Sequence, residues 1–144
     1  MSVDHRRARA DGRIAVIPHA ECRELLESTT VGRVAFVDDD GLQLIPVNFA
    51  VIDGYIFFRT STDSVLSHLA AGIDEVVFGV DYHGEVYREG WNVTVKGSTF
   101  RVTDPATHDR VMSWSRLRPW AGGDRGVVIR LDPHSMQGRR VSGH

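Results

Sequence analysis

The chain has 144 residues, of which 42% are hydrophobic and 25% are charged, with a formal net charge of −2. This composition fits one globular domain and provides no general electrostatic drive toward nucleic acid or an anionic membrane surface. The single cysteine, Cys22, excludes an internal disulfide and a cysteine-based metal site. No apolar run approaches the roughly 20 residues of a membrane-spanning helix, and the N-terminus lacks the apolar segment of a secretory signal, so we expect a cytoplasmic protein.

Both ends of the chain are polar, which predicts tails at residues 1–13 and 142–144 around a single domain at 14–141. The N-terminal segment carries several arginines and almost nothing apolar to bury. We therefore expect a solvated tail there rather than a nucleic-acid-binding arm.

Between these ends, short β-favouring runs alternate with three helical segments. The expected helices cover residues 18–29, 62–71 and 105–114. The expected strands cover residues 32–37, 42–52, 55–59, 75–81, 90–102 and 125–131. Tight turns at 38–41 and 53–54 and a loop through His83 and Gly84 separate them.

The strand at 90–102 changes phase at Gly97, where its apolar residues move to the other face of the strand. Such a shift at a glycine indicates a β-bulge or a barrel corner. About six antiparallel strands with short turns predict a mainly β fold, a small barrel with short flanking helices.

A strand at 55–58 leads through Arg59 and Thr60 directly into the second helix. Its four apolar residues predict a strand that is buried on both faces. Arg59 places a fixed positive charge at the strand end, Ser61 adds a hydroxyl, and Thr60 with Asp63 fits a capping box. A helix N-terminus with these groups favours a phosphate, although an ordinary capped helix with Arg59 in a surface ion pair fits the same residues.

The chain contains, in order, the motifs GRVAFV, PVNF, a strand ending in RT, a helix, VVFGVD and GWNVTVKGS. In the order of these motifs it resembles the FMN-binding split β-barrel family of pyridoxamine 5′-phosphate oxidase. Within it, the chain is similar to the branch that includes the 5-nitroimidazole resistance proteins. The resemblance covers residues 18–141. It implies a homodimer with one flavin in each of two clefts between the barrels.

The resemblance also assigns roles to individual residues. Arg59 and Thr60 match the pair that binds the flavin phosphate, and Ser64 matches a small polar residue just before a family lysine. That lysine is replaced by Val65, which should weaken FMN binding. Residues along the flavin ring are implied in the second strand, namely Pro46, Val47, Asn48 and Phe49. Pro46 also fits a simple sheet edge.

Further candidates have structural alternatives. Trp91 resembles an aromatic residue near the cofactor cleft and equally fits a core or interface tryptophan, while Lys96 fits an anion contact or a solvated lysine. Trp120, in a glycine-rich loop, fits a ring-stacking lid or packing against the barrel. His68 and His83 are candidate catalytic residues by analogy with a histidine near the cofactor in the nitroimidazole-resistance branch, and both also fit exposed surface positions.

The functional expectation is an FMN-dependent oxidoreductase that passes electrons from a reduced nicotinamide to a small substrate. No spacing of histidine and carboxylate residues predicts a metal site, and no serine lies in a nucleophile elbow. Two alternatives are a reductase that uses a deazaflavin coenzyme and a non-catalytic protein that binds flavin or haem.

Overall fold

The computed structural model describes residues 12–114, 117 and 126–143. These residues form one seven-stranded antiparallel sheet and three short helices. The strands are β1 (Gly12–Ile17), β2 (Val31–Asp38), β3 (Gly41–Ile52), β4 (Tyr55–Thr60), β5 (Ile73–Gly84), β6 (Glu89–Arg101) and β7 (Val127–Gly143). The helices are α2 (His19–Glu27), the 3₁₀ helix η1 (Val65–Ala71) and α3 (Pro105–Met112).

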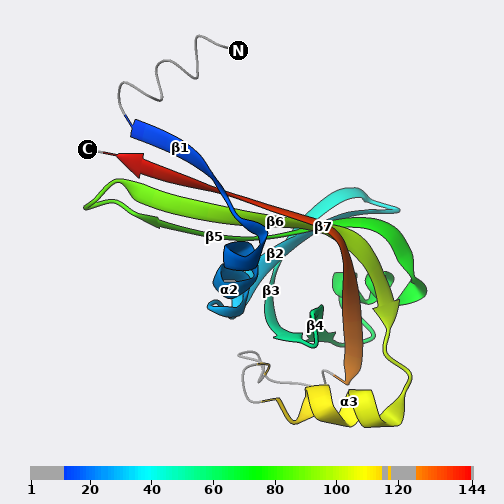
Figure 1. Ribbon diagram of the computed structural model, residues 1–144. Helices are drawn as coiled ribbons and strands as arrows, with labels where there is room; N and C mark the ends of the chain where they lie inside the picture. The colour runs from blue at the N-terminus through cyan, green and yellow to red at the C-terminus, as the bar shows by residue number, and fades with distance from the viewer. Residues whose placement is uncertain (1–11, 115–116, 118–125, 144) are drawn as a thin grey trace.

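Strands β2 to β7 close into a barrel. The strand order is β1-β7-β4-β3-β2-β5-β6, and β6 also pairs with β7, so the two ends of this order meet. Figure 1 shows the barrel with α3 against one side of it and α2 at its border with an extended sheet. The predicted mainly β split barrel of about six strands is confirmed, and β1 is an addition outside the closed part.

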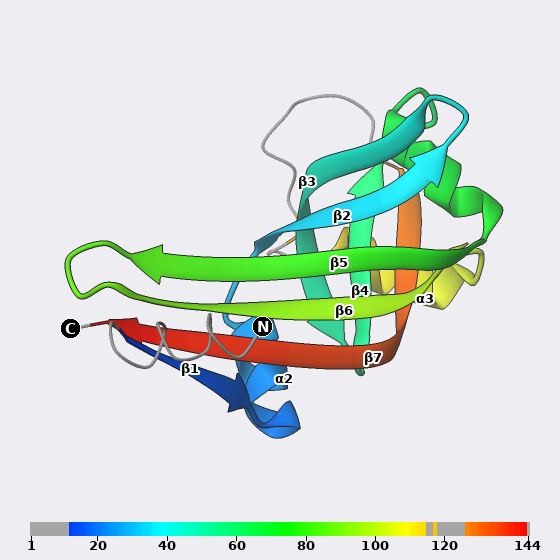
Figure 2. The ribbon, with the colours of Figure 1, turned by 90° about the horizontal axis from the view of Figure 1, so that it is seen from above.

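Strands β5, β6 and β7 continue past the barrel as an arm, seen from above in Figure 2. Along this arm β1 pairs with the end of β7, from Gly12 opposite Gly143 to Ile17 opposite Gly138. The predicted tails are therefore wrong at Gly12, Arg13, Ser142 and Gly143. Backbone pairing does not require apolar side chains, so a polar composition did not exclude these strands.

The apolar side chains form two clusters on the two sides of the barrel wall. Ile56 and Phe58 lie in the cluster that fills the barrel interior. Phe57 points the other way, into a smaller cluster with Val111 of α3 and Val128 of β7. The prediction that this strand is buried on both faces is confirmed for these three side chains, which are at most 3% exposed, and is wrong for Tyr55, which is 40% exposed at the start of the strand.

Helix α2 packs against the barrel through Cys22 and Leu26. Gly138 of β7 makes room for this contact, since a Cβ there would lie 2.7 Å from the Cys22 Sγ. Burial, and to a smaller extent the neighbouring Glu21 charge, raise the pKa of the Cys22 thiol. Cys22 is thus a core residue of the α2 contact.

Two predicted helix features have different outcomes. Helix α3 begins as expected, because the Asp104 side chain accepts a hydrogen bond from the Thr107 N–H at 3.0 Å and Pro105 follows it. The helix expected at 62–71 instead begins at Val65 and is a 3₁₀ helix. Its cap is Ser64, which accepts from the Leu66 N–H at 3.2 Å. The predicted capping box of Thr60 and Asp63 is wrong, because Thr60 is the last residue of β4.

Strands β5, β6 and β7 contain two register shifts. One lies between Lys96 and Gly97 of β6 against β7, which confirms the bulge expected at Gly97. The other lies between Ile73 and Val76 of β5. Strand β5 also runs on through His83 to Gly84, where a loop was expected, because this segment pairs with β6. None of the described helices is long and apolar enough to span a bilayer.

Candidate functional site

The end of β4 holds the residues that the sequence assigned to a phosphate. Arg59 is half-buried, and alternation along the strand places it on the same side as Phe57, outside the barrel. Thr60 faces the opposite side and is fully buried, and its Oγ1 has no hydrogen-bond partner among the described residues. A buried hydroxyl without a partner is uncommon in folded proteins. Because this hydroxyl is on the interior side of the strand, it is separated from the outer surface where Arg59 lies.

The two serines that follow are engaged within the chain. The Ser61 hydroxyl lies 2.7 Å from Asp63 Oδ1, to which it donates, and Ser64 caps η1. Val65, in the place of the family lysine, is 47% exposed. Of the side chains at this strand end, the Arg59 guanidinium is therefore the donor on the outer barrel surface, whereas the Thr60 hydroxyl is buried on the other side of the strand. One arginine, with Asp63 as an opposing charge four residues later, provides less charge for a phosphate than an arginine–lysine pair.

The PVNF segment of β3 divides between two faces. Val47 and Phe49 are buried in the barrel interior, whereas Pro46 is exposed and Asn48 is half-buried. The strand changes partners at this point, because Asn48 pairs with Val31 of β2 and Phe49 with Phe58 of β4.

Because β3 pairs with β4 from Phe49 onward, the PVNF segment lies beside the end of β4 that holds Arg59. Asn48 and Arg59 each lie one residue beyond the Phe49–Phe58 pair, at the same end of it. The fold thus brings Pro46, Asn48 and Arg59 to one region of the outer barrel surface. Val47 and Phe49 could contribute only backbone atoms to a ligand there.

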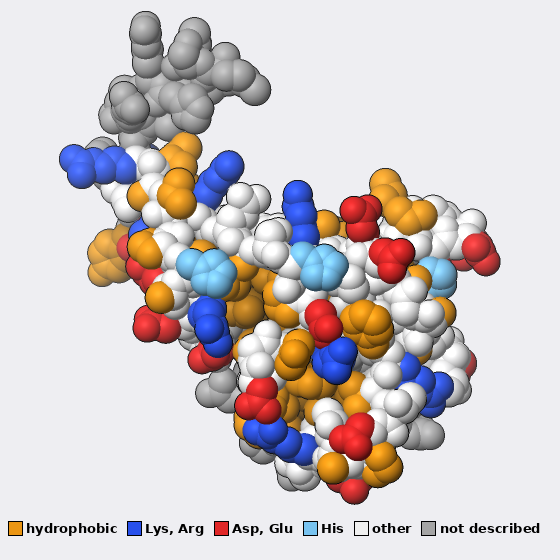
Figure 3. All heavy atoms as spheres, turned by 45° about the vertical axis from the view of Figure 1, so that its right-hand side comes forward, with side chains coloured by type: hydrophobic (Ala, Val, Ile, Leu, Met, Phe, Trp, Pro, Cys, Tyr) orange, Lys and Arg blue, Asp and Glu red, His pale blue; other side chains and the backbone are white. Residues whose placement is uncertain are grey.

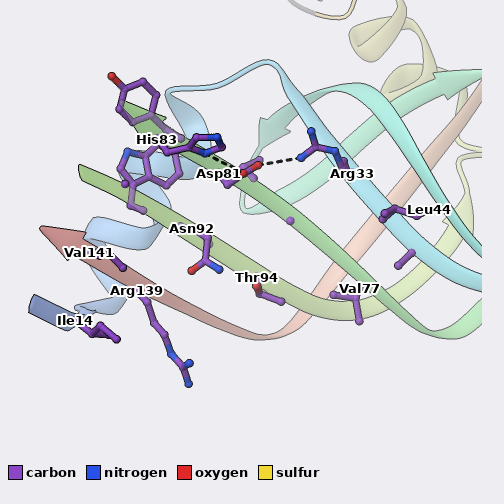
Figure 4. Close-up of a pocket in the computed structure, with 17 residues that line it drawn as sticks. Ile14, Arg33, Leu44, Val77, Asp81, His83, Asn92, Thr94, Arg139 and Val141 are labelled. Carbon is purple, nitrogen blue, oxygen red and sulfur yellow. Dashed lines mark hydrogen bonds and ion pairs between the residues drawn. The ribbon is translucent and has the colours of Figure 1, made fainter. Parts of the chain in front are cut away.

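Trp91 and His83 lie elsewhere, on the arm, where they line a hollow of about 590 Å³. The Trp91 ring stacks on Tyr82 with ring centroids 6.4 Å apart. Figure 4 shows Arg33, Asp81 and His83 in a row along the hollow. Arg33 donates to Asp81 at 3.0 Å, and His83 Nδ1 lies 3.8 Å from the other Asp81 oxygen.

The remaining candidates are dispersed. Lys96 lines a separate hollow of about 380 Å³ beside the β2–β3 hairpin. His68 of η1 stacks against Phe36, with centroids 6.0 Å apart. Trp120 lies outside the described residues. The sequence candidates therefore do not form a single cluster, and those with geometry suited to an anion are at the end of β4.

The outer surface of β2, β3 and β5 is apolar and uncovered. The registers align Val37 with Leu42 and Ala35 with both Leu44 and Val77, so these side chains share one face. Leu42 is 85% exposed, Leu44 67% and Val37 59%. We call these five residues the open face. Figure 3 shows, on one side of the molecule, hydrophobic side chains gathered in a hollowed region with charged side chains around it.

Comparison with known families identifies the chain. The family model described as pyridoxamine 5′-phosphate oxidase matches residues 18–140. The chain belongs to the pyridoxamine 5′-phosphate oxidase family. None of the curated proteins matches it.

Solved structures of similar proteins agree with this family. A candidate pyridoxamine 5′-phosphate oxidase from Corynebacterium glutamicum is 25% identical, with a TM-score of 0.78 over 93% of this chain and 97% of the other. An FAD-binding protein from Mycobacterium smegmatis is 29% identical, with a TM-score of 0.73 over 89% and 98%. A candidate 5-nitroimidazole resistance protein from Bacteroides thetaiotaomicron shares the fold, with a TM-score of 0.72 at 11% identity over 92% and 90%.

Two features of the structure were not predicted from the sequence motifs. The Arg33–Asp81 pair joins residues 48 positions apart, and no local pattern marks it. The open face was also missed, although alternating apolar residues in 35–37 and 42–44 carry its signal. Among the described residues, no three histidine, cysteine, aspartate or glutamate side chains are grouped to hold a metal ion.

Proposed function

We propose that this chain is a flavin-dependent oxidoreductase with its cofactor on the outer barrel surface at Pro46, Asn48 and Arg59. The observation that supports this most strongly is the position of Arg59 at the end of β4, on the same outer surface as Pro46 and Asn48 of β3, within the segment that the family model matches. Similar proteins are named for FAD binding.

In this proposal the protein binds and orients the flavin. Arg59 would bind a phosphate oxygen of the flavin. Backbone groups of Pro46 and Asn48 would be available to the ring, since proline leaves one ladder position without a donor. The flavin, when bound, supplies the hydride chemistry between a reduced nicotinamide and a small substrate.

We further propose that the protein is a homodimer and that the second copy covers the open face. The registers place Pro46 and Asn48 on the same side of the sheet as Leu44 and Val31. A flavin at Pro46 and Asn48 would therefore lie at the border of this interface. Contiguous exposed apolar residues of this kind mark interaction surfaces in soluble proteins.

Both FMN and FAD are compatible with this site. FMN carries a terminal phosphate, which favours two cationic side chains. The family resemblance implies an arginine and a lysine, and in this chain Val65 replaces the lysine. FAD replaces that terminal group with a diphosphate and an adenosine, and Val65 is an exposed apolar residue beside the same strand end. FMN remains our first proposal, and the substitution at Val65 favours FAD as the second.

The test is to purify the protein, record its absorption spectrum, release any bound cofactor and identify it by chromatography. A yellow protein that releases FMN or FAD and oxidises NADH or NADPH supports the proposal. A colourless protein that binds deazaflavin and reduces it supports the alternative coenzyme. Bound flavin or haem without turnover under any electron donor supports a non-catalytic binding protein and contradicts the enzymatic proposal.

A further inference from the structure

A second hollow lies between α2 and the bend of β7. It has a volume of about 350 Å³, and its walls come from α2, the β3–β4 turn and residues 133–136 of β7. His19, Arg23 and Glu27 of α2 line it at four-residue spacing, which places them on one face of the helix. The β3–β4 turn precedes β4, whereas Arg59 and Thr60 end that strand. The hollow is therefore at the opposite end of β4 from the proposed flavin phosphate site.

A β-bulge positions His134, which lines both this hollow and the one beside the β2–β3 hairpin. Lys96 pairs with Ser135 and Gly97 with Pro133, so His134 is the extra residue of β7. Gly97 is required at this point, because a Cβ would overlap the Asp132 carbonyl. Bulges commonly redirect a side chain next to a functional site.

A hydrogen-bond chain fixes the His134 ring. The Ser98 hydroxyl donates to the Asp74 carbonyl at 2.9 Å, and its oxygen lies 3.0 Å from His134 Nε2. Because the Ser98 proton is committed to the carbonyl, Nε2 must be the donor to Ser98. The other ring nitrogen, Nδ1, has no hydrogen-bond partner among the described residues.

Among the described residues, the two carboxylates around the hollow are engaged in other interactions, whereas its one arginine is not. Of its two carboxylates, Asp53 is 2.8 Å from Arg110, and Glu27 already has an interaction of its own. Arg23 has no hydrogen bond or ion pair within the part of the chain that the structure describes. Its Nη2 lies 4.0 Å from where a Cβ of Gly54 would be, so the guanidinium reaches across to the β3–β4 turn.

The hollow also has an apolar base. Leu26 is buried in the barrel cluster, and Val51 and Met136 pack against that cluster while lining the hollow. An inorganic ion would leave these side chains without a contact. A ligand with an anionic group and an apolar body would use both parts of the hollow.

We propose that this hollow binds a small organic anion, a carboxylate or a phosphate monoester on an aromatic or aliphatic body. Arg23 binds the anionic group, with His19 and His134 beside it, and Leu26, Val51 and Met136 contact the apolar body. The inference does not depend on the proposed flavin function, because it uses none of the flavin-site residues.

The test is to titrate the ¹⁵N-labelled full chain with benzoate, phenyl phosphate and, as the uncharged control, benzyl alcohol, following backbone amide shifts. We expect saturable shifts in residues 19–27 and 134–136 with the two anions. The Arg23→Ala variant should weaken anion binding by roughly tenfold or more, as expected for a lost charge-assisted contact. His134→Gln, which keeps an N–H donor for Ser98, should weaken it to a smaller extent.

Two controls separate this site from the flavin site and from general charge effects. Arg101→Ala removes another exposed arginine outside the hollow and should leave anion binding unchanged. Arg23→Ala should leave flavin affinity unchanged. Equal binding of benzyl alcohol, shifts that do not saturate, or wild-type anion binding by Arg23→Ala would overturn the proposal.

Discussion

Two outer surfaces of the same barrel differ in how their apolar side chains are covered. Where β3, β4 and β7 meet α3, the outward residues Ala50, Phe57 and Val128 are buried beneath Val111. Where β2, β3 and β5 meet, the outward residues Leu42 and Leu44 are exposed. Strand β3 contributes to both surfaces with the same alternation. The difference is therefore in what lies on top of the strand, and in our proposal a second copy of the chain covers the open face.

The largest expected effect is at the covered surface. Phe57→Ala should reduce the free energy of unfolding by about 3–5 kcal/mol, because it removes a fully packed ring between the barrel wall and α3. Chemical denaturation followed by tryptophan fluorescence measures this. Val86→Ala is the matched control, since Val86 is 86% exposed at the β5–β6 turn and should change stability by about 0.5 kcal/mol or less. A small effect of Phe57→Ala would show that α3 does not cover this surface in solution.

Substitutions on the open face should change the oligomeric state of the protein rather than the stability of its fold. The double variant Leu42→Asp/Leu44→Asp should convert a dimer into a folded monomer near 16.0 kDa, because two charges would be buried without partners in the interface. Light scattering at micromolar concentration measures the mass. Val86→Asp, an equally exposed apolar position away from the open face, should remain dimeric. If the wild-type protein is itself a monomer, the proposal that a second copy covers the open face is wrong.

A substitution of Arg59, at the border between the two surfaces, should change the affinity for the cofactor. Arg59→Ala should weaken FMN binding by about 1.5–3 kcal/mol, or roughly ten- to a hundred-fold, as expected for one charge-assisted contact. Riboflavin, which lacks the phosphate, should bind the variant as it binds the wild type. Fluorescence titration of the apoprotein with both flavins gives the affinities, with Arg101→Ala as the surface control. If Arg59→Ala kept wild-type FMN affinity, the phosphate would lie elsewhere.

Val65→Lys should have a smaller effect of opposite sign. It adds a positive charge at a position that is 47% exposed beside the same strand end, so water screens part of the gain. We expect tighter FMN binding by a few-fold and no change for riboflavin. The same titration measures it, and weaker FMN binding would place the phosphate away from η1.

The smallest effect concerns the cap of α3. Hydrogen bonds from the Thr107 hydroxyl and then its N–H lower the pKa of Asp104. A lowered pKa in the folded state contributes stability that is present above the unfolded-state pKa and is lost as the pH falls through the folded value. Asp104→Ala should lower Tm slightly at neutral pH. On acidification its Tm should fall less than that of the wild type, because the variant lacks the Asp104 carboxylate, and thermal denaturation at several pH values measures both effects. An unchanged acid profile would contradict the capping role.

Local patterns predicted much of the barrel and less of its surroundings. The unbroken apolar run at 55–58 indicated a strand buried on both faces, and the phase change at Gly97 indicated the bulge. The pairing of β1 with β7 was missed because it joins the two ends of the chain through backbone groups, which leave no side-chain pattern. The capping box failed because Thr60 and Ser64 are both acceptable caps, and the length of β4 determines which one is used.

The site was predictable only to the extent that it is local in sequence. Arg59, Thr60 and the 46–49 segment were proposed because each lies in a short motif. The separation of Val47 and Phe49 from Asn48 follows from strand alternation, which the motif alone did not resolve. The α2–β7 hollow was not predicted, since it combines a helix face with a bulge residue more than 100 positions later.

The most direct test of this account is the flavin affinity of the monomeric Leu42→Asp/Leu44→Asp variant. If the cofactor lies at the border of an interface that a second copy covers, the folded monomer should bind flavin much more weakly than the wild type, although both substitutions are outside the phosphate site. Circular dichroism confirms the fold, and fluorescence titration gives the affinity. A folded monomer with wild-type flavin affinity would contradict the interfacial site.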